Sequence, residues 1–307
     1  MEINDQWILD TIYAVKAGLR VRNKPVITRL LKAANRHGMM GYGDPRSTMS
    51  ITNGYTRPKE EDLTGYYGPD PYDINFVYPI EEALLETARV KLTPFIPRIH
   101  AALYMEQMHT HPHLQAGCPW EHHDLDADFL PFYELRARRN AGAVGFAVID
   151  KSTPDSSHPE WGGSFAGTIG LQQTDPSGLV SEVCWVITFP AFQRTHVTSN
   201  AVGILLRYCL NLPSANMPGL GFRRVQWQCW KDNQASLKAA KRMQFKEEGT
   251  YRWKWMSMPA GKRGNAPREG DSKPHNSGWD GVVLSVVSDD WENGAREKVQ
   301  EVIDRKE

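Results

Sequence analysis

The feature that most constrains the fold of this chain is a series of segments between residues 88 and 287 that change between strand and helix patterning. Strand patterns lie at 88–95, 143–150, 165–173, 182–188, 223–230, 245–255 and 279–287. Helical patterns lie at 96–108, 125–139, 200–210 and 233–243. Strands that follow one another and then alternate with helices favour a mixed α/β sheet.

The composition and charge of the chain argue against several function classes. Of 307 residues, 40% are hydrophobic and 23% are charged, which is close to the average of globular proteins. Lys and Arg together number 36, as do Asp and Glu, so we expect neither nucleic acid nor a membrane as a partner. No apolar run reaches 18 residues, and the acidic start MEINDQWILD does not resemble a signal peptide. The four cysteines form no CxxC pair, so we expect a reduced, cytoplasmic protein without structural zinc.

Three zones of the chain differ in patterning and predict the domain organisation. Residues 1–75 combine two short helical patterns with a Gly-, Pro- and Tyr-rich stretch at 41–75, which predicts a helical and irregular N-terminal extension. We expect the stretch at 41–75 to pack on the main domain, and binding of a partner is the alternative. Residues 76–290 hold the predicted sheet and a polar insertion loop at 259–278. Residues 291–307 carry apolar residues at helical spacing and predict a C-terminal helix.

The loop between a predicted strand at 182–188 and a predicted helix at 200–210 is a candidate anion site. Free backbone N–H groups at the start of a helix, together with the helix dipole, favour an anion such as phosphate. Phosphate cradles usually carry glycines, and the sequence QRTHVTSNA at 193–201 has none. A phosphate cradle and a plain turn both remain open on these residues alone.

Several motifs in a fixed order carry a resemblance to a known family. They are EVCWVI at 182–187, QRT at 193–195, RRVQWQC at 223–229 and DNQASLKAAKRMQFKEEGTYR at 232–252. Together they resemble the GNAT acyl-CoA N-acyltransferases, and most of all the RimJ/RimL-like branch, which acetylates the N-termini of ribosomal proteins. The resemblance covers about residues 88–256. It implies the GNAT fold, in which helices flank a mixed, mostly antiparallel central sheet, and it implies acetyl-CoA as a co-substrate.

The resemblance also implies roles for individual residues. Glu182 stands where a glutamate acts as general base in relatives that resemble histone acetyltransferases. Such a base works best with a pKa near the operating pH, so Glu182 would need partial burial; a solvated or salt-bridged carboxylate is the alternative. The implied contacts with acetyl-CoA come from Val186, Ile187, Thr188, Gln193, Arg194, Thr195, His196, Val197, Thr198, Ser199, Asn233 and Ser236. The first three would use backbone groups, and the last two are equally suited to capping a helix.

The chain departs from the family pattern at several positions. Ala240 stands where many members carry the tyrosine that protonates the leaving thiolate, although a thiol pKa of about 8.5 makes thiolate a tolerable leaving group. His196 and Thr198 stand where the wider family has glycines, so we expect side-chain donors to replace part of the close backbone approach to the pyrophosphate. Gln244 replaces a glycine after a helix, which implies either a different helix end or a slightly strained one.

Five histidines lie within the segment HTHPHLQAGCPWEHH at 109–123. Alternating histidines can bind one metal ion on an extended strand, but Pro112 and the loop composition argue against such a strand, and we expect no metal. The resemblance places this segment between the first two helices, where the acceptor pocket is usually shaped. Contact with the acceptor, proton transfer and an ordinary solvated loop remain open for these residues.

The sequence therefore predicts an acetyl-CoA-dependent N-acetyltransferase in which a primary amine attacks acetyl-CoA directly in a ternary complex. The acceptor is a protein N-terminus or a small molecule, and the chain is a monomer or a homodimer. Two alternatives are a GNAT-fold protein that binds acyl-CoA without catalysis, and an acyl-CoA enzyme with another outcome, such as an O-acyltransferase or a decarboxylase. Tryptophans on predicted strands, namely Trp227, Trp230, Trp253 and Trp255, are expected in the core or lining a pocket.

Overall fold

The computed structural model describes residues 52–56, 59, 61–256 and 264–305. The chain divides into two compact units, Met1–Glu60 and Glu61–Glu307. The helical patterns expected within residues 1–40 lie outside the described residues. The sheet, its flanking helices and the candidate site all belong to the second unit.

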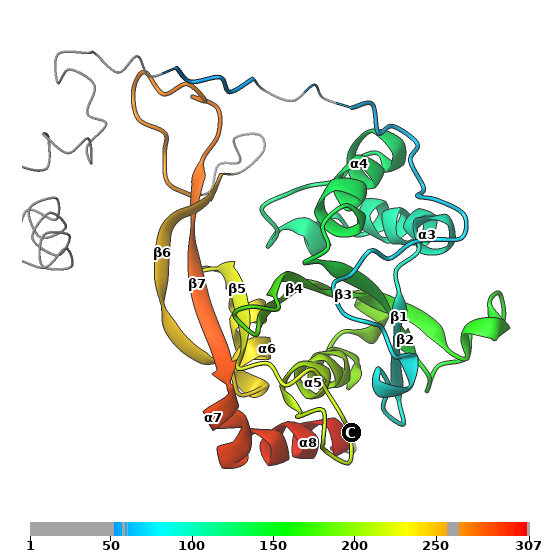
Figure 1. Cartoon of the computed structure of the whole chain (residues 1–307). Coiled ribbons are helices and arrows are strands. Elements are labelled where there is room, and N and C mark those ends of the chain that lie inside the picture. The colour runs from blue at the N-terminus through cyan, green and yellow to red at the C-terminus, as the bar shows by residue number, and fades with distance from the viewer. Residues whose placement is uncertain (1–51, 57–58, 60, 257–263, 306–307) are drawn as a thin grey trace, which may run out of the picture. The chain divides into compact units, whose positions relative to one another are not determined.

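A seven-stranded sheet forms the centre of this unit, with the strand order β1-β2-β3-β4-β5-β7-β6 (Figure 1). The strands are β1 (Val90–Pro94), β2 (Val144–Asp150), β3 (Ser164–Asp175), β4 (Val180–Thr188), β5 (Arg224–Trp230), β6 (Lys246–Met256) and β7 (Gly278–Val287). Neighbouring strands are antiparallel, except that β4 and β5 are parallel. The predicted mixed, mostly antiparallel α/β sheet is confirmed.

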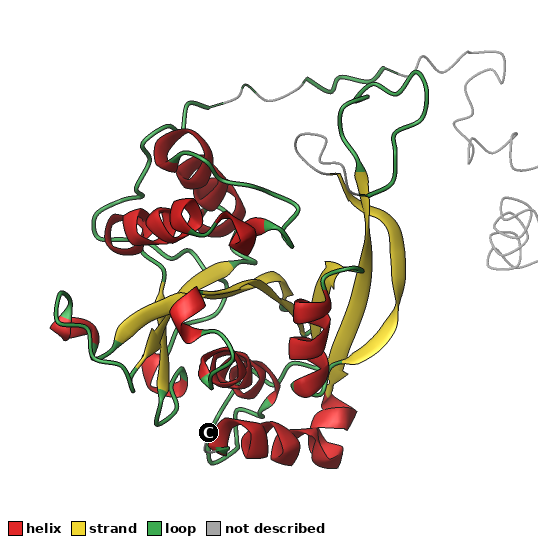
Figure 2. Cartoon of the chain, turned by 180° about the vertical axis from the view of Figure 1, so that it is seen from behind, coloured by secondary structure: helices red, strands yellow, loops and turns green. Residues whose placement is uncertain are grey.

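Helices cover both faces of the sheet (Figure 2). The longer ones are α3 (Pro97–Thr110), α5 (Val197–Leu210), α6 (Gln234–Arg242) and α8 (Arg296–Asp304). The shorter ones are η1 (Glu82–Leu84), η2 (Pro112–Gln115), η3 (Leu125–Phe129), α4 (Leu130–Tyr133), η4 (Glu134–Arg138), η5 (Pro159–Trp161), η6 (Pro190–Phe192), α7 (Ser288–Asp290) and η7 (Trp291–Ala295). Helices α3 and α4 lie on one face of the sheet, and α5 and α8 lie beyond the other (Figure 1).

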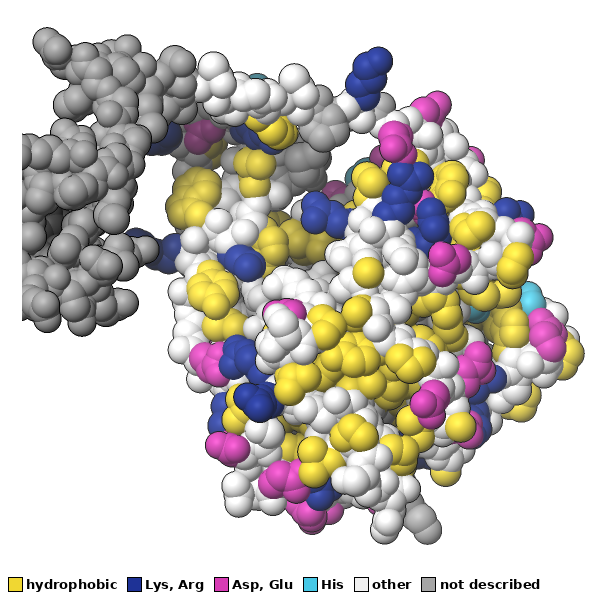
Figure 3. Space-filling model, viewed as in Figure 1, with side chains coloured by type: hydrophobic (Ala, Val, Ile, Leu, Met, Phe, Trp, Pro, Cys, Tyr) yellow, Lys and Arg dark blue, Asp and Glu magenta, His cyan; other side chains and the backbone are white. Residues whose placement is uncertain are grey.

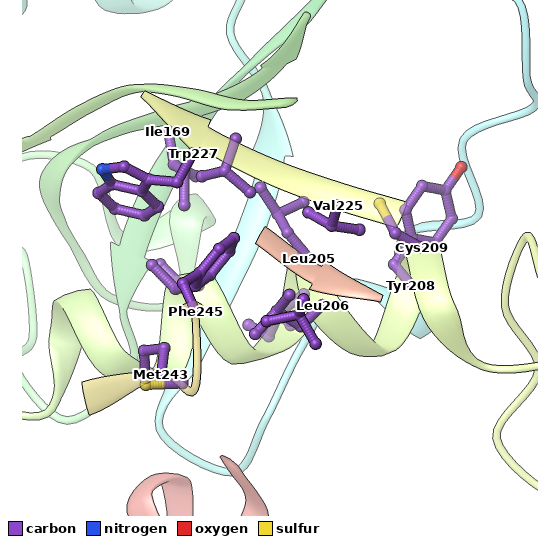
Figure 4. Close-up of a cluster of buried hydrophobic side chains, with 14 of the residues drawn as sticks. Ile169, Leu205, Leu206, Tyr208, Cys209, Val225, Trp227, Met243 and Phe245 are labelled. Carbon is purple, nitrogen blue, oxygen red and sulfur yellow. The ribbon is translucent and has the colours of Figure 1, made fainter. Parts of the chain in front are cut away.

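Two hydrophobic cores fill the space between these layers. One joins α5 and α6 to the sheet through Leu205, Val225, Trp227 and Phe245 (Figure 4). The other joins α3, η3 and α4 to the opposite face, with Phe95 and Tyr104 near its centre. Because both faces of β2 are covered, every residue of that strand is buried.

Most predicted elements are present, with three differences. Helix α5 begins at Val197, three residues before its predicted start, because the predicted loop closes into a helical turn at this point. Residues 125–138 form π-helical turns on either side of α4. Trp253 is 50% exposed, so its predicted place in the core or lining a pocket is wrong. It lies on β6, the edge strand, which pairs with β7 alone and is exposed along most of its length.

The segments that precede β1 and follow β7 in the sequence both pack against the body of this unit. Leu63 is buried, and Ile74, Phe76 and Tyr78 contact the first core. At the other end, the predicted C-terminal helix is α8, which packs on α5 where Ile303 lies against Gly203. The Arg207 guanidinium donates to the Gln300 Oε1 atom of α8 and to the backbone oxygen of Glu86.

Candidate active site

The centre of the sheet opens where β4 and β5 separate. Their pairing covers only Val180–Val183 against Arg224–Trp227, although β4 continues to Thr188 and β5 to Trp230. On its other edge, β4 stays paired with β3 as far as Thr188. The end of β4 therefore has one edge that no described strand pairs with. Val186, Ile187 and Thr188, the predicted backbone contacts of the acyl group, lie on this stretch.

Trp185 interrupts the regular strand at the same place. Its φ of 51° lies in the left-handed region, which is unfavourable for a bulky aromatic residue and is often found at functional sites. The pairing of β3 with β4 shifts register here, between Thr168 and Gly170. The Trp185 ring lies directly over Gly170, where a Cβ atom would meet it at 2.7 Å.

The loop that follows β4 leads into the first turn of α5. Val197, Thr198 and Ser199 form this turn, so their backbone N–H groups lie at the positive end of the helix dipole. The Val197 N–H donates to the Thr195 hydroxyl, and the Thr198 hydroxyl is hydrogen-bonded to that of Thr188 at 2.7 Å. The predicted cradle is thus a helix start tied to the end of β4 by side chains.

Two more residues of this loop have defined positions. The Gln193 amide donates to the backbone oxygen of Thr188, which ties the loop to the strand a second time. Arg194 is exposed and has a φ of 65°. A positively charged side chain on an exposed loop beside a helix start suits an anionic ligand.

His196 is held by a buried carboxylate. Its Nε2 atom lies 3.1 Å from Asp150 Oδ1 at the end of β2. Burial acts to raise the pKa of Asp150, but hydrogen bonds from Ser152, Thr153 and His196 outweigh it and lower that pKa. His196 has a φ of −67°, so a non-glycine residue stands here without backbone strain.

Glu182 lies on β4 at the paired end of the opening and is only 3% exposed. One of its carboxylate oxygens accepts a hydrogen bond from the Gln172 amide, and the other accepts from the amides of Gln226 and Gln228. Burial raises the pKa of Glu182, and these hydrogen bonds together with Lys254 oppose that shift. The solvated-carboxylate alternative is therefore wrong, because this side chain is buried and both of its oxygens accept hydrogen bonds from glutamines.

The three glutamines around Glu182 were not predicted. Gln172 and Gln226 pair with Glu182 in the sheet register, and Gln228 follows two residues after Gln226 on the same face. The sequence QWQ at 226–228 contains a signal for them, because polar residues at every second position of a central strand indicate a polar group buried on one face of the sheet. The Oε1 atom of Gln228 is buried and has no hydrogen-bond partner in the described residues.

An aromatic pocket lies on the same side of β4 as α3 and α4. The cavity itself is about 30 Å³, within a hollow of about 390 Å³ that includes open solvent. Trp185 and Ile187 of β4 line it together with Phe129 and Phe132. His122 is the member of the predicted histidine-rich segment that reaches this pocket. Figure 3 shows that this face of the molecule is hollowed between the β6–β7 hairpin and the α3–α4 helices.

Asn233 and Ser236 occupy the start of α6. The Asn233 side chain accepts a hydrogen bond from the Ser236 backbone N–H, which makes it the N-cap of the helix. The Ser236 hydroxyl accepts from the Trp227 indole at 2.9 Å. Helix capping is thus confirmed for Asn233, and contact of either residue with CoA stays a prediction.

Metal ligands are not gathered anywhere in the part of the chain that the structure describes, because no group of three His, Cys, Asp or Glu side chains is placed to hold an ion. Within the histidine-rich segment, His109 contacts the backbone oxygen of His123, while the rings of His111 and His113 contact each other. Among the described residues, no helix has the length and apolar character needed to cross a membrane.

The chain is similar in sequence and in fold to known acetyltransferases. Residues 89–246 match the family model described as an acetyltransferase (GNAT) domain. A GCN5-related N-acetyltransferase from Brucella melitensis is 22% identical, with a TM-score of 0.54, covering 70% of this chain and 83% of that one. A structure described as a probable acetyltransferase of the GNAT family, from Chromobacterium violaceum, is also 22% identical with a TM-score of 0.54, covering 78% and 100%.

A third similarity is weaker. Mycobacterium smegmatis RimJ in complex with CoA-disulfide is 14% identical with a TM-score of 0.48, and the match covers 69% of this chain and 88% of that one. A similarity at this level does not distinguish one branch of a fold family from another. No curated protein is significantly similar in sequence.

Proposed function

The chain belongs to the GNAT acetyltransferase family, and from this membership we propose that it transfers the acetyl group of acetyl-CoA to a primary amine in the cytoplasm. The observation that carries the proposal is the separation of β4 and β5 beside the start of α5. A strand edge that no described strand pairs with lies beside N–H groups that have no acceptor within their own helix. Together they suit an extended thioester with a pyrophosphate at one end.

The cofactor contacts follow from these two features. Backbone groups of Val186, Ile187 and Thr188 would hold the acetyl carbonyl and the pantetheine arm, because rigid backbone donors stabilise a developing oxyanion without rearranging. The first turn of α5 would bind the pyrophosphate, with Arg194 adding a positive charge. The protein thereby orients the thioester for in-line attack by the amine.

Glu182 is the proposed general base. The amine must lose a proton as its nitrogen forms the new C–N bond and the C–S bond to CoA breaks. A carboxylate whose pKa is raised by burial is a better proton acceptor near neutral pH than a solvated one. Since both oxygens are hydrogen-bonded to glutamines, proton transfer would pass through a water, and the CoA thiolate leaves without a tyrosine at position 240.

Binding and turnover can be tested separately. Calorimetric titration of acetyl-CoA should show a single saturable site, and mass spectrometry should show products heavier by one acetyl group after incubation with amines. Saturable binding without any acetylated amine would favour the alternative of a non-catalytic acyl-CoA-binding protein. Acetylated alcohols, or loss of carbon dioxide from an acyl-CoA, would favour the other alternative.

The base assignment has its own test. Glu182→Gln should lower kcat by about 10²–10⁴-fold, the usual contribution of general acid–base catalysis, while the affinity for acetyl-CoA stays within about twofold. Glu247→Gln is the matched control, because Glu247 is exposed on β6 and forms a surface ion pair with Lys241. Unchanged turnover in Glu182→Gln would remove Glu182 from the mechanism and leave it a structural role.

A further inference from the structure

The aromatic pocket beside β4 is built from two layers of rings. Trp120, Phe132 and Trp185 are half-buried and form its open side, with ring centroids 5.3 Å apart for Trp120 and Phe132 and 6.4 Å apart for Phe132 and Trp185. Tyr104 and Phe129 are buried beneath them and stack on each other at 4.7 Å. A flat aromatic group that packs at the open side would contact these exposed ring faces and edges.

A single buried polar atom without a partner belongs to this pocket. The His122 Nε2 atom has no hydrogen-bond partner in the described residues, and the residue is 3% exposed. Two other polar groups of the lining are used internally, since Tyr133 donates to the Phe95 oxygen and the Thr168 hydroxyl donates to the Trp185 oxygen. An unpaired buried polar atom is unfavourable by about 1–3 kcal/mol, so a ligand that satisfies it gains affinity.

The position and orientation of His122 are fixed by the fold. Its backbone N–H donates to Gln115 Oε1, and its backbone oxygen accepts from Gln115 Nε2. The imidazole packs on Phe129 and Phe132 at 5.4 and 4.7 Å between centroids. Burial lowers the pKa of His122 to about 4, so the ring is neutral at pH 7, and its unpaired Nε2 atom can form an uncharged hydrogen bond.

The absence of charged side chains in the described lining limits which ligands the pocket suits. None of the described residues that line the pocket is Asp, Glu, Lys or Arg. A second ammonium group, as in a polyamine, would lose its hydration here without gaining a counter-ion. The pocket therefore suits an uncharged, mostly apolar group with one polar atom.

The pocket also adjoins the proposed reaction site. Trp185 and Ile187, which line it, stand on either side of Val186 in the stretch of β4 that would hold the acetyl carbonyl. An acceptor whose ring packs at the open side of the pocket would keep its amine close to this stretch.

We propose that the pocket selects the acceptor, which is an amine with an aromatic ring that carries one hydroxyl or ring N–H for a hydrogen bond to His122 Nε2. This inference rests on the proposed acetyltransferase function. It names the substrate class among the protein N-termini and small amines that the sequence left open. His122 positions the ring and takes no part in proton transfer at the reacting nitrogen.

Calorimetry with the full chain in the presence of CoA tests the proposal without turnover. The probes are tyramine, phenethylamine, which lacks the ring hydroxyl, and the diamine putrescine. Tyramine should bind about five- to tenfold more tightly than phenethylamine, the effect of one net hydrogen bond, and putrescine should bind weakest. Equal or tighter binding of putrescine would overturn the aromatic assignment.

Three variants test whether the difference in affinity between tyramine and phenethylamine arises in the aromatic pocket. His122→Phe keeps an aromatic ring in the packing and should bring the affinities for tyramine and phenethylamine within about twofold of each other. His123→Phe, at an exposed neighbouring position, should retain the wild-type ratio. If His122→Phe does not fold, Trp120→Ala at the half-buried open side should weaken both aromatic probes by similar factors. A wild-type ratio in His122→Phe, or unchanged affinities in Trp120→Ala, would contradict the proposal.

Acetylation assays separate the failure of this inference from that of the proposed function. Acetylation of putrescine with no binding of either aromatic amine would sustain the acetyltransferase and refute the pocket assignment. Binding of tyramine with the expected ratio, without acetylation of any amine, would sustain the pocket and refute the activity.

Discussion

At the scale of single residues, Gln244 shows how a departure from a family pattern becomes a measurable strain. It follows α6 with a φ of 69°, so this helix ends in the left-handed conformation that glycine adopts most easily. Its N–H donates to Lys241, and that of Phe245 donates to Ala240, as expected where a helix is closed by a left-handed residue. Of the two outcomes that the sequence left open, the strained helix end is therefore the observed one.

Replacing Gln244 by glycine should therefore stabilise the protein. Gln244→Gly removes the steric conflict of a left-handed side chain, and we expect a gain of about 0.5–1 kcal/mol in the free energy of unfolding after the entropy of glycine is offset. Lys238→Gly, at an exposed position within α6, is the control and should lose about 1 kcal/mol. Urea unfolding measures both, and a loss of stability in Gln244→Gly would contradict the strain.

The pH dependence of stability tests the burial of Glu182. Its pKa is raised in the folded protein, so its contribution to stability is fully present below the unfolded pKa of about 4.5 and is lost as the pH rises through the folded value. Glu182→Gln cannot ionise. The stability of this variant relative to wild type should therefore increase as the pH rises from 4.5 towards neutrality, as measured by urea unfolding at several pH values. A difference that does not vary with pH would mean that the pKa of Glu182 is not raised.

At the scale of elements, the bulge in β4 depends on a glycine in the neighbouring strand. A Cβ atom at Gly170 would lie 2.7 Å from the Trp185 ring and 2.7 Å from the Val144 oxygen, and backbone atoms cannot yield cheaply. Gly170→Ala should lower the free energy of unfolding by about 1–3 kcal/mol. It should also weaken acceptor binding, because the displaced Trp185 ring lines the aromatic pocket.

The matched control for this change is Gly249→Ala. Gly249 also lies on a strand, but an added Cβ atom would meet nothing within 4 Å. Chemical denaturation should show a change within about 0.5 kcal/mol for this variant. Comparable losses in both variants would indicate a general effect of removing glycine from strands rather than contact with Trp185.

The start of α5 gives a second test at this scale. Because His196 has no left-handed φ and is anchored to Asp150, His196→Gly should not tighten CoA binding. We expect it to weaken binding several-fold by freeing the first turn of the helix, as measured by calorimetry. Ala191→Gly, at an exposed position in η6, should have little effect. Tighter binding in His196→Gly would mean that the side chain obstructs the pyrophosphate.

The same elements show what could be predicted from the sequence. Period-two and helical patterns located β1 to β7 and the long helices, since local patterning largely decides these elements. The start of α5 was placed three residues late because Val197, Thr198 and Ser199 are poor helix formers, and their position depends on tertiary contacts such as the Thr188–Thr198 hydrogen bond. Trp253 was misplaced because an edge strand has the same composition as a central one.

At the scale of the whole molecule, the site depends on contacts that no local pattern contains. The glutamines around Glu182 come from β3 and β5, and the walls of the aromatic pocket come from helices and strands far apart in sequence. The motif resemblance names Glu182 and the loop after β4 as candidate site residues, because both lie within one short stretch of the sequence. His122 was one of five candidates, and only its burial among Phe129 and Phe132 singles it out.

The proposed cofactor site predicts how the folded molecule as a whole responds to its ligand. A ligand that binds only the folded state stabilises it by about 2.7 kcal/mol at 100 times its Kd. For a unit of this size, that corresponds to a rise in Tm of about 5–10 °C. Acetyl-CoA should produce such a shift in wild type and an equal one in Glu182→Gln, because Glu182 is the proposed base and is not among the proposed cofactor contacts. Thermal melts followed by circular dichroism measure this. A shift in wild type that is absent from the variant would mean that Glu182 supports the cofactor site, and no shift in either would contradict acetyl-CoA as the co-substrate.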